Sequence, residues 1–167
     1  NIIFSNNSSD GIGGGMYNNG IRGISNPKIT NSVFSNNSSG TGGAMFNSAE
    51  GGGKSNPEIT NVTFNQNSAS NVGGAIFNNV GFSGGTSNPV IVNTIIYGNT
   101  PDQIANNNNN SAAPTVTNSL VEGGFSGTGN IDADPQFADA NDPDGADNTF
   151  ATNDDGLRLT SGSSAID

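Results

Sequence analysis

The side chains best suited to chemistry in this chain are the carboxylates of its last third. Residues 122–167 contain ten acids and one base, Arg158, whereas residues 1–121 contain four acids and three bases. The net charge of -10 is therefore almost entirely local. Carboxylates without basic partners favour a cation such as Ca²⁺, which binds about six to eight oxygen ligands. The scarcity of Lys and Arg argues against nucleic acid as a partner.

Six aspartates around Gly145 form the candidate metal site. Asp154 or Asp155 could close a loop around a hard cation such as calcium. The spacing departs from an EF-hand loop, since no Glu follows at the twelfth position. The alternative is a solvated acidic loop whose aspartates occupy turn and cap positions. The candidate ligands are Asp139, Asp142, Asp144, Asp147, Asp154 and Asp155.

A catalytic site is not predicted, so we expect that the chain is not an enzyme. It contains no His and no Cys, which excludes an imidazole base, a thiolate nucleophile and a disulfide framework. Polysaccharide hydrolysis needs facing carboxylates, and residues 1–121 hold only four acids. Lys28 and Glu58 occupy equivalent positions in successive repeats, where we expect an exposed ion pair.

Repeats of about 30 residues must position any such site. Asn-initiated apolar segments begin at residues 1, 31, 61, 93 and 118. Gly-Gly segments begin at residues 13, 42 and 73, and Pro-containing segments begin at residues 25, 55, 87 and 113. The apolar segments are too short for helices. Three short strands per coil predict an all-β fold, a right-handed parallel β-helix or β-solenoid.

Stacked coils should place like residues on like residues. The expected apolar ladders are Ile29, Ile59, Ile91 and Val116; Phe4, Phe34, Phe64, Ile96 and Val121; and Met16, Met45 and Ile76. The expected amide ladders are Asn31, Asn61, Asn93 and Asn118; and Asn7, Asn37, Asn67 and Asn99. Such ladders would satisfy buried polar groups mutually. This explains how a chain with only 31% hydrophobic residues can have a core.

The division into regions follows the repeats. Residues 1–121 are predicted to form regular coils, and residues 122–167 to form acidic, less regular C-terminal coils or a cap of the same solenoid. Residues 51–54, 80–86 and 101–113 vary between repeats and are expected as loops at a corner. No apolar run approaches the roughly 20 residues of a membrane span.

Two sets of motifs resemble known surface proteins. Gly-Gly-Ala-Met at 42–45 and Gly-Gly-Ala-Ile at 73–76 each follow a Phe-x-x-Asn, at 34–37 and 64–67. This pairing resembles the GGAI and FxxN repeats of polymorphic outer-membrane-protein adhesins. The segments 130–139 and 155–167 resemble the C-terminal part of bacterial choice-of-anchor Q proteins. The resemblance covers nearly all of the chain and implies export and attachment to the cell surface through a sorting domain.

The expected function is therefore that of an extracellular or cell-surface structural or adhesive module, within a longer bacterial protein. Its coil ends could self-associate into a fibre, because an open coil end presents unpaired N–H and C=O groups. Other expected partners are a surface glycan, a host ligand or a ligand on a neighbouring cell. A polysaccharide-binding or polysaccharide-cleaving β-helix is the alternative. An ice-binding solenoid is a second alternative, with Thr30, Thr60, Val92 and Thr117 as an imperfect threonine row.

Overall fold

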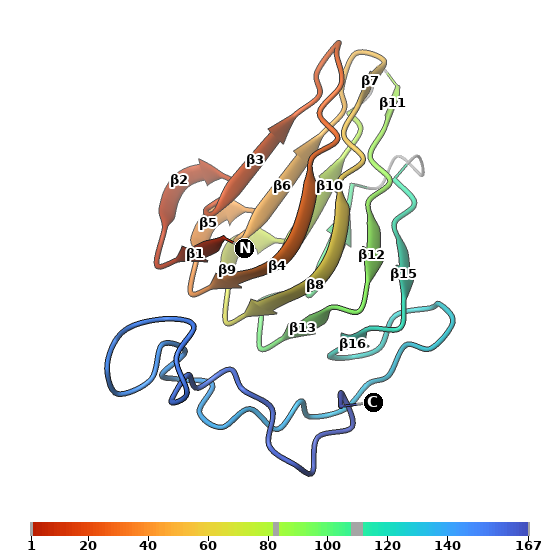
Figure 1. The fold of residues 1–167 in the computed structure, drawn as a ribbon. Coiled ribbons are helices and arrows are strands. Elements are labelled where there is room, and N and C mark those ends of the chain that lie inside the picture. The colour runs from red at the N-terminus through yellow and green to blue at the C-terminus, as the bar shows by residue number, and fades with distance from the viewer. Residues whose placement is uncertain (1, 82–83, 108–111, 167) are drawn as a thin grey trace.

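A computed structural model describes residues 2–81, 84–107 and 112–166, which form sixteen strands and no helix. Figure 1 shows the strands stacked into coils. No helix capable of crossing a membrane occurs within these ranges. Asn1, Phe82, Asn108–Asn110 and Asp167, with parts of two expected loops, lie outside the described residues.

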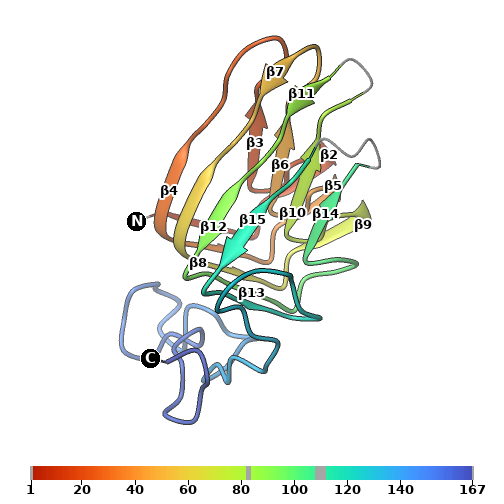
Figure 2. The same cartoon turned by 90° about the vertical axis from the view of Figure 1, so that its right-hand side faces the viewer.

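Three walls of parallel strands enclose the core (Figures 1 and 2). The first wall contains β1 (Ile3–Ser5), β4 (Lys28–Ser35), β8 (Glu58–Asn65), β12 (Val90–Val92), β13 (Ile95–Tyr97), β15 (Thr115–Thr117) and β16 (Leu120–Val121). The second contains β2 (Ser8–Ile12), β5 (Ser38–Thr41) and β9 (Ser68–Val72). The third contains β3 (Met16–Asn19), β6 (Met45–Ser48), β10 (Ile76–Asn79) and β14 (Ile104–Asn106). The predicted all-β parallel solenoid is confirmed.

The apolar ladders stack in the predicted register. Phe34 pairs with Phe4 on one side and Phe64 on the other, with ring centroids 4.5 Å and 4.9 Å apart and nearly parallel planes. Each stacked ring pair contributes roughly 0.5–1.5 kcal/mol beyond the burial of its area. The isoleucine and methionine ladders are also in register, and Ile104 extends the latter by one coil. The threonine row Thr30, Thr60, Val92 and Thr117 is aligned as well.

The predicted asparagine corner is confirmed, because Asn31, Asn61, Asn93 and Asn118 all have left-handed backbone, with φ between 48° and 56°. Asparagine adopts this conformation at less cost than most residues. The amide ladder predicted for the same corner is largely wrong. In the described ranges only Asn61 Nδ2 donates along it, to Asn31 Oδ1 at 3.1 Å. These side chains are exposed, so water can satisfy them without a ladder.

The second predicted amide ladder is confirmed and runs through the interior. Asn7 Nδ2 donates to Asn37 Oδ1, Asn37 Nδ2 to Asn67 Oδ1, and Asn67 Nδ2 to Asn99 Oδ1, at 2.8–2.9 Å. Each of Asn37, Asn67 and Asn99 also donates from Nδ2 to a phenylalanine carbonyl of the preceding coil. The ladder therefore ties each coil to both of its neighbours.

A further amide ladder was not anticipated from the sequence. Asn18, Asn47, Asn78 and Asn106 are linked by Nδ2 to Oδ1 hydrogen bonds of 2.7–2.9 Å. Asn18, Asn47 and Asn78 end the three Gly-Gly segments, and Asn47 and Asn78 are fully buried. The glycines of the same segments have a steric role. Gly42 has a φ of 68°, and a Cβ on Gly43 would collide with the Gly74 carbonyl oxygen of the next coil.

The insertions at 51–54 and 80–86, which were expected as loops, include short paired strands. β7 (Gly53–Lys54) and β11 (Gly85–Thr86) pair in parallel beyond the corner of the coils (Figure 1). Equal placement of the two insertions allows Gly53 to face Gly85, so even the protruding segments stack. Insertions at equivalent positions of successive coils can therefore pair even though they lack an apolar pattern.

From Glu122 onward the described chain forms turns and two isolated bridges, Leu120 with Ile131 and Phe137 with Leu159. Figure 1 shows this segment, in blue, running past the coils instead of adding a full coil. It returns as far as the third coil, where Asn65 Nδ2 donates to Ala140 O at 3.1 Å and Gln66 Nε2 to Asn141 Oδ1 at 2.9 Å.

The interior ladder predicts a large effect for Asn67→Ala. The substitution removes the Nδ2 that donates to the buried Phe34 carbonyl and the Oδ1 that accepts from Asn37 N and Nδ2, so we expect a loss of about 2–4 kcal/mol. The control is Asn71→Ala, which removes an exposed amide with a marginal 3.5 Å contact and should change stability by less than about 0.5 kcal/mol. Urea unfolding measures both, and equal losses would contradict the ladder's role.

Candidate functional site

The predicted metal ligands lie in a loop of turns in which carboxylates accept backbone hydrogen bonds. Asp139 Oδ1 accepts from Asn141 N at 2.9 Å, and Asp147 Oδ1 accepts from Thr149 N at 2.8 Å. In both contacts the aspartate carboxylate accepts from the backbone N–H two residues later, which is the geometry of an Asx turn. Asp139 and Asp147 therefore occupy turn positions, as expected for a solvated acidic loop.

Two of the six aspartates, Asp154 and Asp155, converge on Thr152. Asp154 Oδ2 accepts from Asp147 N at 3.1 Å, and Asp155 accepts from the amides of Ala151 and Thr152 at 2.8 Å and 3.1 Å. The Thr152 hydroxyl lies 2.7 Å from Asp154 Oδ1 and 3.0 Å from Asp155 Oδ1. A hydroxyl has one proton, so it donates to one carboxylate at a time. These contacts fold the loop end around Thr152.

The hydrogen bond from Thr152 lowers the pKa of Asp154 below its ordinary value of 3.8, and the backbone amide of Asp147 acts in the same direction. A donor stabilises the charged carboxylate relative to the neutral acid. The lowered pKa means that the ionised form favours the folded loop. This contribution is present above pH 3.8 and is lost as the pH falls through the lowered pKa.

The remaining candidates, Asp142 and Asp144, use their backbone carbonyls in turns. Asp142 O accepts from Gly145 N at 3.1 Å, and Asp144 O accepts from Thr149 N at 3.2 Å. Within the described ranges, no three acidic side chains converge so that they could hold a metal ion. The carboxylates of Asp139, Asp147, Asp154 and Asp155 instead accept hydrogen bonds from amide or hydroxyl donors. Calcium binding by the six aspartates stays a prediction.

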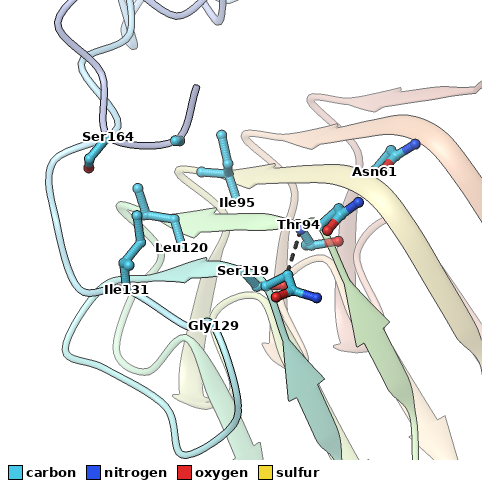
Figure 3. A pocket seen from close by; sticks show the side chains of 11 residues that line it. Asn61, Thr94, Ile95, Ser119, Leu120, Gly129, Ile131 and Ser164 are labelled. Atoms are coloured by element: carbon cyan, nitrogen blue, oxygen red, sulfur yellow. Dashed lines mark hydrogen bonds between the residues drawn. The ribbon is translucent and has the colours of Figure 1, made fainter. Parts of the chain in front are cut away.

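A groove beside the first wall was missed by the sequence analysis. It encloses about 620 Å³ between the first wall and residues 164–165 (Figure 3). Its lining contains no charged residue. The lining combines corner amides, hydroxyl groups and aliphatic side chains. It consists of Asn61, Asn93 and Asn118; Thr94 and Ser119; Ile95, Leu120 and Ile131; and Gly129, Ser164 and Ala165.

Ile95 and Leu120, two members of an outward-facing ladder, line the floor of this groove. The members of this ladder pair from one coil to the next along the first wall, in the order Ile3, Val33, Thr63, Ile95 and Leu120. Leu120 is only 2% exposed although its side of the strand faces away from the core. The alternation of side chains in a strand could have revealed this ladder. The position of residues 164–165 could not be foreseen, because no repeat relates them to the coils.

A second cavity, of about 530 Å³, lies where the coils become incomplete, between residues 98–104 and 121–125. Glu122 Oε2 accepts from Gly98 N at 2.8 Å and from Gln103 Nε2 at 2.7 Å. Gln103 Oε1 in turn accepts from Asn99 Nδ2 at 2.7 Å, so the interior amide ladder ends on a carboxylate. Partial burial raises the pKa of Tyr97, and the negative charges of Asp134 and Glu122 raise it further.

The basic side chains are not gathered at either cavity. Lys28 Nζ lies 3.6 Å from Glu58 Oε2, with the two side chains 71% and 63% exposed. This is the exposed ion pair that the sequence predicts. Such a pair contributes at most about 1 kcal/mol, because water screens it and both side chains lose freedom. Arg22 and Lys54 are also exposed and line neither cavity.

Replacing Thr152 tests the acidic loop. We expect Thr152→Ala to raise the pKa of Asp154 toward 3.8, because the largest stabilising donor is removed. Carboxyl chemical shifts in an NMR titration measure this pKa directly. Thr160→Ala is the control, since the Thr160 hydroxyl donates to Gln136 O and contacts no carboxylate. An Asp154 pKa that is the same in both variants would refute the assigned contact.

Calcium is tested by thermal melting with excess Ca²⁺ and with a chelator. A ligand that binds only the folded chain raises the melting temperature by mass action. We expect the midpoint to rise with Ca²⁺ and to rise less in a variant with Asp154→Asn and Asp155→Asn. Mg²⁺ at equal ionic strength controls for screening of the acidic segment. An unchanged midpoint would remove the calcium prediction.

Comparison with known proteins identified no relative of the chain. No protein-family model matches the chain, and neither a curated protein nor a solved structure shows a significant match.

Proposed function

We propose that this chain is a rigid, non-catalytic module of a bacterial cell-surface protein, with a structural or adhesive role. The observation that carries the proposal is the continuous interior amide ladder from Asn7 to Asn99. It joins four successive coils through side-chain hydrogen bonds, which are buried from Asn37 to Asn99, in addition to the backbone pairing. A solenoid cross-linked in this way resists bending, which suits a spacer that holds a binding surface away from a cell.

The two motifs shared with the polymorphic adhesins have structural roles that support this proposal. In Phe-x-x-Asn, Phe34 forms the ring stack and Asn37 the amide ladder. The third position, Asn36, has left-handed backbone and turns the corner. In Gly-Gly-Ala, the glycines allow close approach of neighbouring coils. The residues that recur therefore build coils, and variation is left to the loops and the outer faces.

The arrangement of charged groups favours a non-catalytic role over polysaccharide cleavage. An acid–base pair normally lies in a cleft, where partial desolvation tunes its pKa. Here the groove beside the first wall has an uncharged lining, the second cavity is lined by Asp102 and Glu122 without a basic residue, and the Lys28–Glu58 pair lies on an exposed face. Water around that pair screens its charges, so it suits a surface contact better than proton transfer.

Polysaccharide binding without cleavage is a second candidate, favoured by the composition of the groove. The exposed amides of Asn93 and Asn118 offer donors and acceptors of the kind that sugar hydroxyls bind. Ile95 and Ile131 add an aliphatic surface beside them. Its volume falls within the range of about 300–1,000 Å³ that is typical of ligand sites. An uncharged groove would favour a neutral polysaccharide over an acidic one.

The non-catalytic role predicts no turnover on a panel of neutral and acidic polysaccharides. The assays measure new reducing ends and unsaturated products, with and without Ca²⁺. Product from any substrate would overturn the proposal, and Lys28→Ala and Glu58→Ala would then test whether the exposed pair takes part. These two side chains are exposed, so each variant should keep its stability within about 1 kcal/mol.

The same panel separates the second candidate. Retention of a polysaccharide without cleavage, reduced by Asn93→Ala and unaffected by Asn71→Ala, would support binding in the groove. Labelling of intact source cells with an antibody against the chain tests the surface location. Labelling only after lysis would contradict it.

A further inference from the structure

We propose that the groove beside the first wall binds a neutral, linear polysaccharide that lies along the stacking axis, with one sugar unit at each of three corner amides. These amides belong to Asn61, Asn93 and Asn118, which occupy equivalent positions in successive coils. The proposal rests on polysaccharide binding, the second candidate function, and specifies the orientation, the length and the chemical class of that ligand.

The corner amides are the polar side chains of the groove that remain free for a ligand. The buried hydroxyls of Thr94 and Ser119 each donate to the carbonyl two residues earlier, at 3.0 Å and 2.8 Å. Within the described ranges, the exposed side chains of Asn93 and Asn118 make no hydrogen bond, and Asn61 uses only its Nδ2, toward the preceding coil. A primary amide both donates and accepts, so each one can bind neighbouring hydroxyl groups of a sugar.

An aliphatic strip runs beside the amide row in the same direction. Ile95 pairs with Leu120 in the next coil, and Leu120 forms a bridge with the exposed Ile131. Figure 3 shows Ile95 and Leu120 pointing from neighbouring strands into the space between the wall and Ser164. A sugar ring has polar edges and C–H faces. A chain along the axis can therefore place C–H groups on the strip and hydroxyl groups at the amides, whereas a chain across the axis meets one amide only.

The spacing of the coils fits one sugar unit per amide. Neighbouring strands lie about 4.7–4.9 Å apart, so three successive corner amides span about 9–10 Å. A pyranose unit in an extended, equatorially linked chain advances by nearly the length of one such step. Residues 128–131 bound the groove beyond Asn118, because Thr128 O accepts from Asn118 N at 2.9 Å. The groove therefore accommodates three units.

The distribution of charge selects a neutral polysaccharide. The lining of the groove contains no charged residue, so a carboxylate or sulfate group would lose water there without gaining a cationic partner. Residues 122–167, which supply one side of the groove, contain ten acids and one base and would repel an anionic chain. A neutral chain avoids both costs.

A peptide strand suits this groove less well than a polysaccharide. Extended peptides bind sheets through main-chain hydrogen bonds to an exposed strand edge. The strands β12 and β13 beneath the groove each pair with a strand on both sides, so their main-chain groups are already used. The free groups of the groove are side-chain amides, which favour a ligand with a hydroxyl group at every step.

The test is isothermal titration calorimetry of the whole chain with neutral, equatorially linked glucose, mannose and xylose oligosaccharides of one to six units. We expect at least one series to bind with a dissociation constant that falls about two- to tenfold for each unit up to the third, because each unit adds one amide contact. Longer oligosaccharides should bind no more tightly. Glucuronic acid oligosaccharides of the same linkage should bind at least tenfold more weakly.

Removal of one end amide locates the third unit. Asn61→Gly should abolish the gain from the third unit and leave the affinity for two units unchanged, since Asn93 and Asn118 remain. Asn31→Gly is the matched control, because Asn31 has the same left-handed corner backbone and lies outside the lining of the groove. It should change neither affinity. Glycine tolerates the positive φ of this corner, and circular dichroism checks that both variants remain folded.

Absence of binding by every neutral oligosaccharide would overturn the proposal. So would equal effects of Asn61→Gly and Asn31→Gly, or tighter binding by an uncharged Ser-Gly repeat peptide than by the oligosaccharides. Binding that does not depend on oligosaccharide length would overturn the axial arrangement and leave polysaccharide binding in place. None of these outcomes involves turnover or the surface location, so the non-catalytic structural role fails or survives separately.

Discussion

The asparagine amides of the two interior ladders find their hydrogen-bond partners in the neighbouring coils, and this constraint organises the molecule. Asn37 and Asn67 are fully buried, where an unpaired amide would cost about 1–3 kcal/mol. Their partners exist only when the repeats are in register. The same register stacks Phe34 between Phe4 and Phe64. Polar and apolar ladders thus specify one alignment, which allows a glycine- and asparagine-rich chain to fold around a narrow core.

The end of the repeats changes the chemistry of the chain. After Val121 no further strand forms in the described residues, and Glu122 receives the last hydrogen bond of the interior ladder. The following residues pass back along the first wall, where Asn65 and Gln66 contact Ala140 and Asn141. This return covers Leu120 and creates an uncharged groove beside the corner amides. The outer face of the wall therefore gains a concave surface that regular coils alone would lack.

The coils could be predicted from the sequence because each position is repeated. Recurrence of Phe4, Phe34 and Phe64 determines both the period and the buried face, and the asparagine corner follows from residue type. The ladder through Asn18 and Asn47 was missed, since an asparagine after two apolar residues can equally lie on an exposed edge. The groove was beyond prediction, and for the acidic loop only the turn positions of aspartates such as Asp139 and Asp147 could be anticipated. Residues 132–166 have no repeat to align them, and their contacts with Asn65 and Gln66 depend on a single return path.

Hydrogen exchange of the asparagine side-chain amides tests the interior ladder most directly. If the ladder holds the coils in register, the Nδ2 protons of Asn37 and Asn67 exchange only through global unfolding, with a protection free energy that follows the stability of the whole solenoid in urea. The exposed Nδ2 protons of Asn71 should exchange near the rate of a free amide. Exchange of Asn67 at the rate of Asn71 in the folded protein would contradict the account.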